Sequence, residues 1–294
     1  MKNYKRMNMV FLLLLLCYLG GSVCVGFFAP FLADTTLKAS ALSYILLLLV
    51  PTIYCVKYNV DVQKKYLIKP VTVSTLLIAA LFVALCYPLI TVANIASQLV
   101  VSNEATALMD SILGPNMVVN VLVIAILPGI VEEVIFRGMF YNEYKEGGMF
   151  LGAIASSLLF GLLHLNFNQF SYAIILGFVF ALVTEATGSI IPSMICHMSI
   201  NALNMLMVYG YSVMGISIED VEITTDQIVL TLAAWSFIAA ICTVGAVGVY
   251  IWLLKHTGRL SHMKGFMKAE SGRRITLPLV IAVGICVAYM IYYG

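Results

Sequence analysis

Long apolar runs, separated by short polar segments, make up most of this chain. A helix of about 20 apolar residues crosses the hydrocarbon core of a bilayer. The runs are continuous rather than alternating, which favours helical spans over a membrane β-barrel. We therefore predict an all-α fold, a polytopic transmembrane helical bundle of about nine spans, with eight as the alternative. The expected spans are residues 8–32, 40–56, 71–100, 117–140, 149–165, 169–186, 190–209, 227–254 and 275–293.

The charges between these runs predict the orientation of the bundle. Basic residues gather before the first span, between the second and third, and between the eighth and ninth. Acidic residues gather instead in residues 104–110 and 219–226. An odd number of spans puts all three basic segments on one side, and the positive-inside bias makes that side cytoplasmic. We expect a cytoplasmic N-terminus and an outer C-terminus.

Composition supports a membrane protein and narrows its partners. The chain is 62% hydrophobic and 10% charged, whereas a soluble domain carries about 25% charged residues. Membrane lipid is therefore an expected partner, and a bacterial cell membrane the expected location. No basic cluster interleaved with aromatic residues appears, so no nucleic acid is expected as a partner. The seven cysteines stand singly, without metal-site or CxxC spacing, as reduced apolar residues do.

Three parts of the chain follow from this pattern. Residues 1–116 hold the first three spans and, in residues 101–115, an apolar stripe that predicts a short interfacial helix. Residues 117–209 form a core of four helices that carries the polar motifs described next. Residues 210–294 hold the last two spans and the basic loop between them.

Glu132, Glu133 and Arg137 lie inside the fourth predicted span. Such charges cost roughly 2.5–3.5 kcal/mol each at the bilayer centre, so they should face a protein interior or a hydrated cavity. Glu133 and Arg137 are four residues apart, with the acid first, which favours an ion pair. We assign that pair mainly to structure and positioning, which leaves Glu132 to face the cavity. Pro128 and Gly129, just upstream, predict a kink.

Two later histidines should reach the layer of Glu132. If the fourth span continues to a turn near Gly147, Glu132 lies about 22 Å and His164 about 26 Å from that turn. His197 lies about 14 Å beyond the turn between the sixth and seventh spans. Asn201 follows His197 by one helical turn and points the same way. Polar groups from three helices are thus expected to converge.

These residue types suit amide hydrolysis. A carboxylate beside a neutral imidazole, here Glu132 with His164, holds and deprotonates water. A second histidine and an amide, His197 with Asn201, donate hydrogen bonds to an oxyanion. Alternatively, Glu132, His164 and His197 match the ligand set of many catalytic zinc sites. The spacing differs from H-E-x-x-H, so a metal is possible but not required, and both mechanisms remain open.

Three motifs in one order resemble a known family. They are Glu132-Glu133-x-x-x-Arg137-Gly138, Phe160-x-x-x-His164 and His197-x-x-x-Asn201. Over residues 117–208 they resemble the CAAX-protease and bacteriocin-processing (CPBP) family of intramembrane proteases, also described as the abortive-infection or type II CAAX prenyl endopeptidase family. The resemblance implies a helical membrane endopeptidase with its site open to the cytoplasm. It also implies water activation by Glu132 and His164, oxyanion stabilisation by His197 and Asn201, and a mechanism described for the family both as metalloprotease and as glutamate-dependent.

Three functions stay open at this level. The expected one is an intramembrane endopeptidase acting on a membrane-associated peptide or a membrane protein. The alternatives are an ion- or proton-coupled transporter using Glu132 and His164 as a relay, and an inactive immunity or scaffold protein. Visible internal repeats, common in transporters, are absent from the sequence. Outside the motifs, we interpret Glu185 as an ordinary helix-end or interface residue and His262 as a solvated loop residue.

Overall fold

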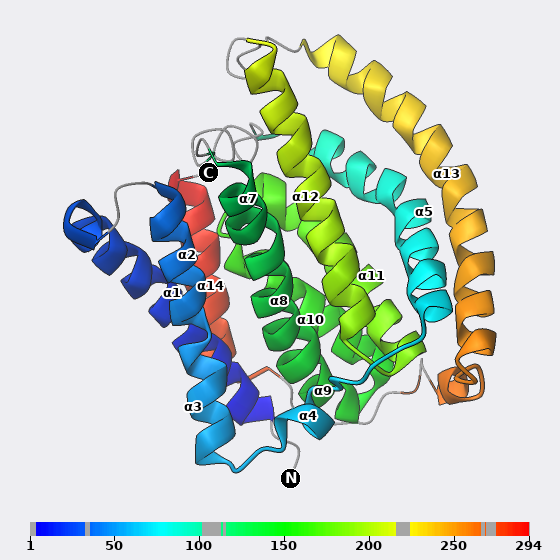
Figure 1. Ribbon diagram of the computed structural model, residues 1–294, viewed down its shortest axis with the longest axis horizontal. Coiled ribbons are helices and arrows are strands. Elements are labelled where there is room, and N and C mark those ends of the chain that lie inside the picture. The colour runs from blue at the N-terminus through cyan, green and yellow to red at the C-terminus, as the bar shows by residue number, and fades with distance from the viewer. Residues whose placement is uncertain are drawn as a thin grey trace.

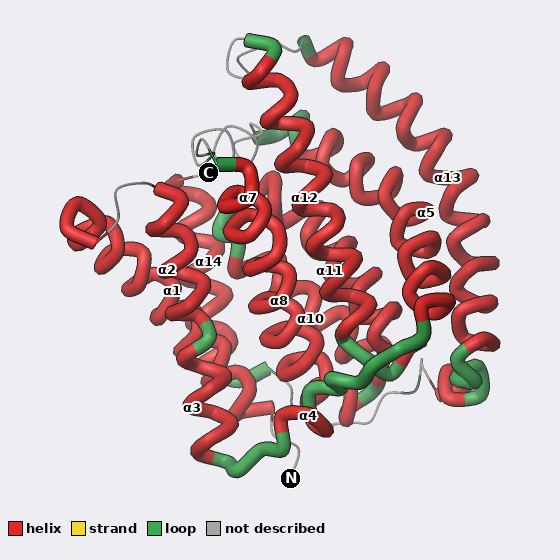
Figure 2. Tube along the Cα trace, viewed as in Figure 1, coloured by secondary structure: helices red, strands yellow, loops and turns green. Residues whose placement is uncertain are grey.

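The structure is a computed structural model that describes residues 4–32, 36–101, 113, 116–215, 224–265, 268 and 275–293. All regular structure within these ranges is helical, which confirms the all-α prediction (Figure 2). Every predicted span is helical over most of its length. The predicted interfacial helix at 101–115 lies almost entirely outside the described residues.

Within the described residues, seven helical segments are long and apolar enough to cross a membrane. They are Tyr4–Cys24, Ala39–Lys57, Val73–Ser97, Met117–Gly147, Phe167–Thr187, Ile191–Val213 and Thr225–His256. The other two predicted spans correspond to shorter apolar helices, α10 (Met149–Leu163) and α14 (Leu277–Tyr293). At 1.5 Å per residue α10 is about 22 Å long, less than the hydrocarbon thickness of about 30 Å. The chain is an integral membrane protein whose fifth and ninth apolar helices are short.

The helices form a bundle with two flanks (Figure 1). On one flank α5 (Val73–Ser97) packs along α13 (Thr225–His256). On the other flank α1 packs against α2, α3 and α14; the bounds of the first three are Tyr4–Leu32, Thr36–Leu47 and Leu49–Lys57. Between the flanks lie α8 (Leu127–Glu133), α10, α11 (Phe167–Thr187) and α12 (Ile191–Val213). The predicted site residues lie on α8 and α12, on η2 (Val134–Tyr141), which continues α8, and directly after α10.

Two apolar clusters hold the bundle together. One joins α1, α3, α10 and α14 to the fourth span through buried side chains that include Phe11, Phe136, Phe140 and Phe160. The other joins α5, α11, α12 and α13 through side chains that include Phe82 and Phe180. Because burial of one such side chain contributes about 1.5–3 kcal/mol, these clusters fix the relative positions of the central helices.

The fourth span is one continuous but irregular helix. It runs through α7 (Met117–Asn120), η1 (Val121–Ile126), α8 (Leu127–Glu133), η2 (Val134–Tyr141) and α9 (Asn142–Tyr144), and then through the 3-10 turn η3 (Lys145–Gly147). The η1 and η2 segments are π-helical. The N–H of Leu127 donates to the carbonyl of Leu122, five residues back, just before Pro128 removes a donor. The predicted disturbance at Pro128 therefore takes the form of a π-helical segment, a feature frequent at functional sites.

Gly129 lets α8 approach α12 closely. A Cβ atom at this position would lie 2.7 Å from Met198 Cγ and 3.1 Å from the Met198 backbone nitrogen. Only glycine fits here without a shift of the neighbouring helix. Since Met198 directly follows His197, this close approach brings the glutamates of α8 within reach of that histidine.

The three basic segments meet at one end of the bundle. The start of α1, the connection from α3 through α4 (Val62–Lys65) to α5, and the end of α13 all lie there (Figure 1). The loop after α13 contains the short η4 (His262–Gly265). This arrangement agrees with the expectation that these segments share one side of the membrane.

Candidate active site

The predicted ion pair in the fourth span is present. Arg137 Nη1 lies 2.9 Å from Glu133 Oε1, and both side chains are fully buried. The three guanidinium nitrogens and Glu133 Oε2 make no hydrogen bond to other described residues. Buried polar atoms in this state are rare and costly. The pair is therefore held chiefly by charge, in a site with unused hydrogen-bonding capacity.

His197 joins the two adjacent glutamates. Its Nδ1 lies 3.0 Å from Glu133 Oε1, and its Nε2 lies 3.6 Å from Glu132 Oε2. His197 is 3% exposed and Glu132 8%, so both groups are almost removed from water. A carboxylate only accepts hydrogen bonds, so Nδ1 of His197 carries the proton shared with Glu133. Its Nε2 then faces Glu132.

Two aromatic rings enclose this cluster. The guanidinium carbon of Arg137 lies 4.4 Å from the ring centre of Phe160 and 5.2 Å from that of Phe180. The ring of His197 contacts the same two rings, with centroid distances of 5.9 and 5.0 Å. Cation–π contacts of this kind stabilise by about 0.5–2 kcal/mol. They partly replace the hydrogen bonds that Arg137 lacks.

His164 contacts Phe160, whose ring also contacts Arg137 and His197. It caps the end of α10, its ring lies edge-on to Phe160 at 4.9 Å, and its Nδ1 lies 2.8 Å from the Phe160 carbonyl. No hydrogen bond or ion pair between described residues joins it to either glutamate. The next residue, Leu165, has φ 55°, a conformation costly for a bulky side chain. The turn that ends α10 at His164 is therefore strained.

Asn201 lies four residues beyond His197 on α12 and is half-buried. Its amide forms no hydrogen bond to another residue in the described part of the chain. The amide is thus available as a donor near the histidine.

Gly138, the last residue of the first motif, makes room for a tyrosine. A Cβ atom there would lie 3.1 Å from Cβ of Tyr66, whose ring packs beneath η2. Tyr66 is 2% exposed, and its hydroxyl lies 3.0 Å from Cys55 Sγ. Burial raises the pKa of Tyr66 above its ordinary value, so the phenol keeps its proton. The connection between α4 and α5 is fixed directly against the motif.

The residues expected to bind zinc, Glu132, His164 and His197, are not arranged as a metal site. Among the described residues no three histidine, cysteine or carboxylate side chains are arranged to hold a metal ion. Glu132 and His197 approach each other, whereas Nδ1 of His164 lies against a carbonyl of its own helix. The arrangement of these donors does not fit the expected zinc site.

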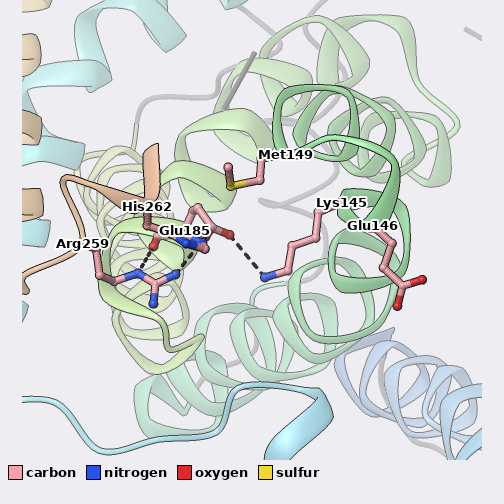
Figure 3. A pocket seen from close by; sticks show the side chains of 6 residues that line it. All are labelled: Lys145, Glu146, Met149, Glu185, Arg259 and His262. Carbon is pink, nitrogen blue, oxygen red and sulfur yellow. Dashed lines mark hydrogen bonds and ion pairs between the residues drawn. The ribbon is translucent and has the colours of Figure 1, made fainter. Parts of the chain in front are cut away.

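A second polar cluster surrounds Glu185 (Figure 3). Its buried carboxylate accepts hydrogen bonds from Tyr141 at 2.7 Å, Lys145 at 3.3 Å and Arg259 at 2.9 Å, and His262 Nε2 lies 2.6 Å away. A cavity of about 400 Å³ is lined by Lys145, Glu146, Met149, Glu185, Arg259 and His262. His262 is 51% exposed, as expected of a solvated loop residue, and it also contacts Glu185 because the loop after α13 folds back onto α11. Glu185 fastens that loop to the fourth span.

Sequence reasoning missed the role of Glu185 and one further contact. The hydroxyl of Tyr44, on α2, donates to Glu132 Oε1 at 3.2 Å. A lone tyrosine in an apolar span carries no sequence signal of such a contact. Glu185 did carry one, since an ionisable residue within a span is a functional candidate by default.

Comparison with known proteins finds a similar family for the part of the chain that carries these residues. Residues 114–203 match the family model described as type II CAAX prenyl endopeptidase Rce1-like. This part of the chain is Rce1-like. The CPBP resemblance of the three motifs is thereby confirmed for this part of the chain, which is similar to a family of membrane proteases. The Rce1-like segment contains all six predicted site residues, from Glu132 to Asn201, but not Tyr44.

A curated relative points the same way. A Bacillus subtilis (strain 168) protein named "Putative membrane peptidase YdiL" is 26% identical over 107 residues. These make up 36% of this chain and 43% of that protein, so the chain spans less than half of the relative's length. No solved structure is significantly similar to this chain. Both similarities are to peptidases, and each covers only part of the chain.

Proposed function

We propose that this protein is an intramembrane endopeptidase that hydrolyses a peptide bond of a membrane-associated peptide or membrane protein. The observation that carries the proposal is the contact of His197 with both Glu132 and Glu133 inside the Rce1-like segment. Buried ionisable groups within spans are usually functional. A structural network alone would not need a histidine between two carboxylates.

Glu132 is the proposed general base, with His164 as its partner. Because a carbonyl only accepts, the hydrogen bond between His164 Nδ1 and the Phe160 carbonyl puts the proton on Nδ1. Nε2 of His164 is then a free acceptor, as a group that orients water must be. Glu132 takes a proton from this water, the water oxygen attacks the scissile carbonyl carbon, and the same proton later passes to the leaving amine.

His197 and Asn201 are the proposed donors to the oxyanion. Nε2 of His197 donates only when the ring is protonated, and Glu133 at Nδ1 stabilises that imidazolium. The Asn201 amide supplies a second donor from the same face of α12. Arg137 balances the charge of Glu133 and acts through it.

The proposed orientation follows from the basic ends of the helices. The N-terminus, the connection between α3 and α5, and the loop after α13 would face the cytoplasm by the positive-inside bias. The site would then open toward the cytoplasmic side of a bacterial cell membrane. Glutamate-dependent hydrolysis is the proposed chemistry, because the expected zinc ligands do not assemble.

The test compares proteoliposomes of the wild-type chain with Glu132→Gln and His164→Ala. The probes are an internally quenched farnesylated CAAX peptide and an unprenylated peptide of the same sequence. We expect both variants to lose cleavage by a factor of about 10²–10⁴, the usual effect of general acid–base catalysis. Glu146→Gln is the matched control, since Glu146 lies in an exposed position at the end of the same long helix.

If Glu132→Gln cleaves the probe at the wild-type rate, Glu132 is not the general base and the proposed active site is wrong. A proton flux that depends on Glu132, measured with a pH-sensitive dye in liposomes that show no cleavage, would favour the transporter. Mapping new peptide N-termini in membranes that express wild-type protein or Glu132→Gln extends the search beyond the two probes.

A further inference from the structure

Tyr44 stands outside the Rce1-like segment but touches its central carboxylate. It lies on α2, a helix that packs against α8 and η1. Its hydroxyl donates to Glu132 Oε1 at 3.2 Å across 88 residues of sequence. The ring is half-buried and packs against the apolar cluster that contains Val131 and Phe160. The flank of the bundle thus contributes a polar group to the site.

The contact divides the two oxygens of Glu132 between two partners. Oε1 accepts from Tyr44, and Oε2 faces His197 Nε2 at 3.6 Å. An unrestrained glutamate side chain has three rotatable bonds, and fixing them costs up to about 1.5–2 kcal/mol of conformational entropy. Tyr44 holds the carboxylate in one orientation and leaves Oε2 directed toward the histidine.

A second phenol–carboxylate pair on the same long helix provides a comparison. Tyr54, on α3, donates to Glu143 Oε1 at 3.3 Å. Glu143 lies on α9, about three turns beyond Glu132. The two pairs share their chemistry and the helix that carries the carboxylate. They differ in position, because Glu132 lies beside His197 whereas Glu143 lies on α9, near the end of the long helix.

We propose that Tyr44 is a positioning residue for Glu132, contributed by the N-terminal helices and acting through the carboxylate rather than on the substrate. The effect of Tyr44 on catalysis rests on the proposed function. The contact between Tyr44 and Glu132 does not. The site is therefore completed by a helix that the family match does not include. Substitution of the phenol should change how Glu132 reacts while leaving substrate binding intact.

The first measurement does not depend on activity. Wild type, Tyr44→Phe and Tyr54→Phe, each as the full chain in liposomes, are treated with dicyclohexylcarbodiimide, which modifies protonated carboxyl groups in apolar surroundings. Mass spectrometry then gives the labelling rate at each glutamate. We expect Tyr44→Phe to raise labelling of Glu132 about tenfold, as loss of a hydrogen bond to a charged group implies, and to leave Glu143 unchanged. Tyr54→Phe should do the reverse.

The second measurement is steady-state cleavage of the quenched farnesylated CAAX peptide. Tyr44→Phe should lower kcat about tenfold with KM within about twofold, because Glu132 loses a hydrogen bond that orients its charged form. Tyr54→Phe should keep both constants. Matched thermal unfolding midpoints for the two variants exclude a general loss of fold.

Each outcome decides a separate point. Unchanged labelling of Glu132 in Tyr44→Phe overturns the inference, as does changed labelling with a wild-type kcat. A rise in KM alone also overturns it, because Tyr44 would then contact substrate. If wild type cleaves no probe peptide, the proposed function fails on these substrates, and the labelling rates still decide whether Tyr44 controls Glu132.

Discussion

Glu133 Oε1 lies 3.0 Å from Nδ1 of His197 and 2.9 Å from Nη1 of Arg137. One carboxylate oxygen therefore links α8 to α12 and balances a fully buried guanidinium. Breaking a buried ion pair by removing one partner is far more damaging than replacing both, because an uncompensated charge remains. The stability of the site and its chemistry consequently depend on the same atom.

Glu133→Gln should destabilise the protein by about 3–5 kcal/mol, because it leaves Arg137 without a counter-charge in the bundle interior. The double variant Glu133→Gln/Arg137→Met should recover much of that loss, since it removes both charges. Chemical unfolding in detergent, followed by circular dichroism, measures the difference. Equal stability of Glu133→Gln and wild type would contradict the buried ion pair.

Gly129→Val should reduce activity and lower the unfolding midpoint. Its side chain would press on Met198, whose backbone nitrogen already lies 3.1 Å from a Cβ at this position, and overpacking typically costs about 1–3 kcal/mol. The separation of α8 from α12 would lengthen the contact of Glu133 with His197. Gly210→Val on α12 is the control, since a Cβ there meets nothing within 4 Å. Equal effects at the two glycines would show that helix approach is unimportant.

Phe160→Leu should impair activity more than its change in volume suggests. The ring of Phe160 contacts Arg137, His164 and His197, and leucine keeps the apolar bulk but removes the π face. We expect a loss of about 0.5–2 kcal/mol from the cation–π contact, seen as reduced kcat and a lower unfolding midpoint. Phe82→Leu, in the other apolar cluster, should lower stability without lowering kcat of the folded fraction.

Glu185→Gln should release the loop after α13 while leaving the motif residues in place. Its carboxylate interacts with Lys145, Arg259 and His262, and a neutral amide cannot balance the charges of Lys145 and Arg259. We expect limited trypsin digestion to cut after Arg259 faster than in wild type, because proteolysis follows local opening. The control is Glu146→Gln, at the edge of the same cavity. Unaltered cutting in Glu185→Gln would show that other contacts fasten the loop.

Exposure to a chelator should leave cleavage of the farnesylated CAAX peptide unchanged within about twofold, because no carboxylate–histidine set in the described part of the chain is arranged as the open three-ligand site of catalytic zinc. The measurement is the initial rate in proteoliposomes before and after dialysis against EDTA. Loss of activity that returns with added zinc would contradict glutamate-dependent hydrolysis.

The lengths of the apolar runs were enough to predict the helices. A span must match the thickness of the bilayer, and a continuous apolar segment satisfies its backbone hydrogen bonds there only as a helix. Helical spacing was likewise enough for the ion pair of Glu133 with Arg137. The contact of Glu133 with His197 was not predictable, since it depends on how closely α8 approaches α12 at Gly129. The π-helical segments on both sides of α8 also change side-chain directions in a way that a regular helical count misses.

Contacts between spans of unrelated sequence were the least predictable part. Tyr44 reaches Glu132 only through the packing of α2 on α8, and neither residue type nor spacing indicates that neighbour. His262 is exposed, as its loop position predicted, but its contact with Glu185 was not predictable because that residue lies on a helix far away in sequence.

The pairing of Arg137 with Glu133 on a single helix turn also bears on biosynthesis. Both residues leave the ribosome together, whereas His197 follows some 60 residues later. The fourth span can therefore enter the lipid phase with its positive and negative groups already matched, which lowers the cost of inserting them. Newly made chains would gain their histidine last, so the protein would acquire reactivity only after the seventh apolar run has been threaded into the membrane.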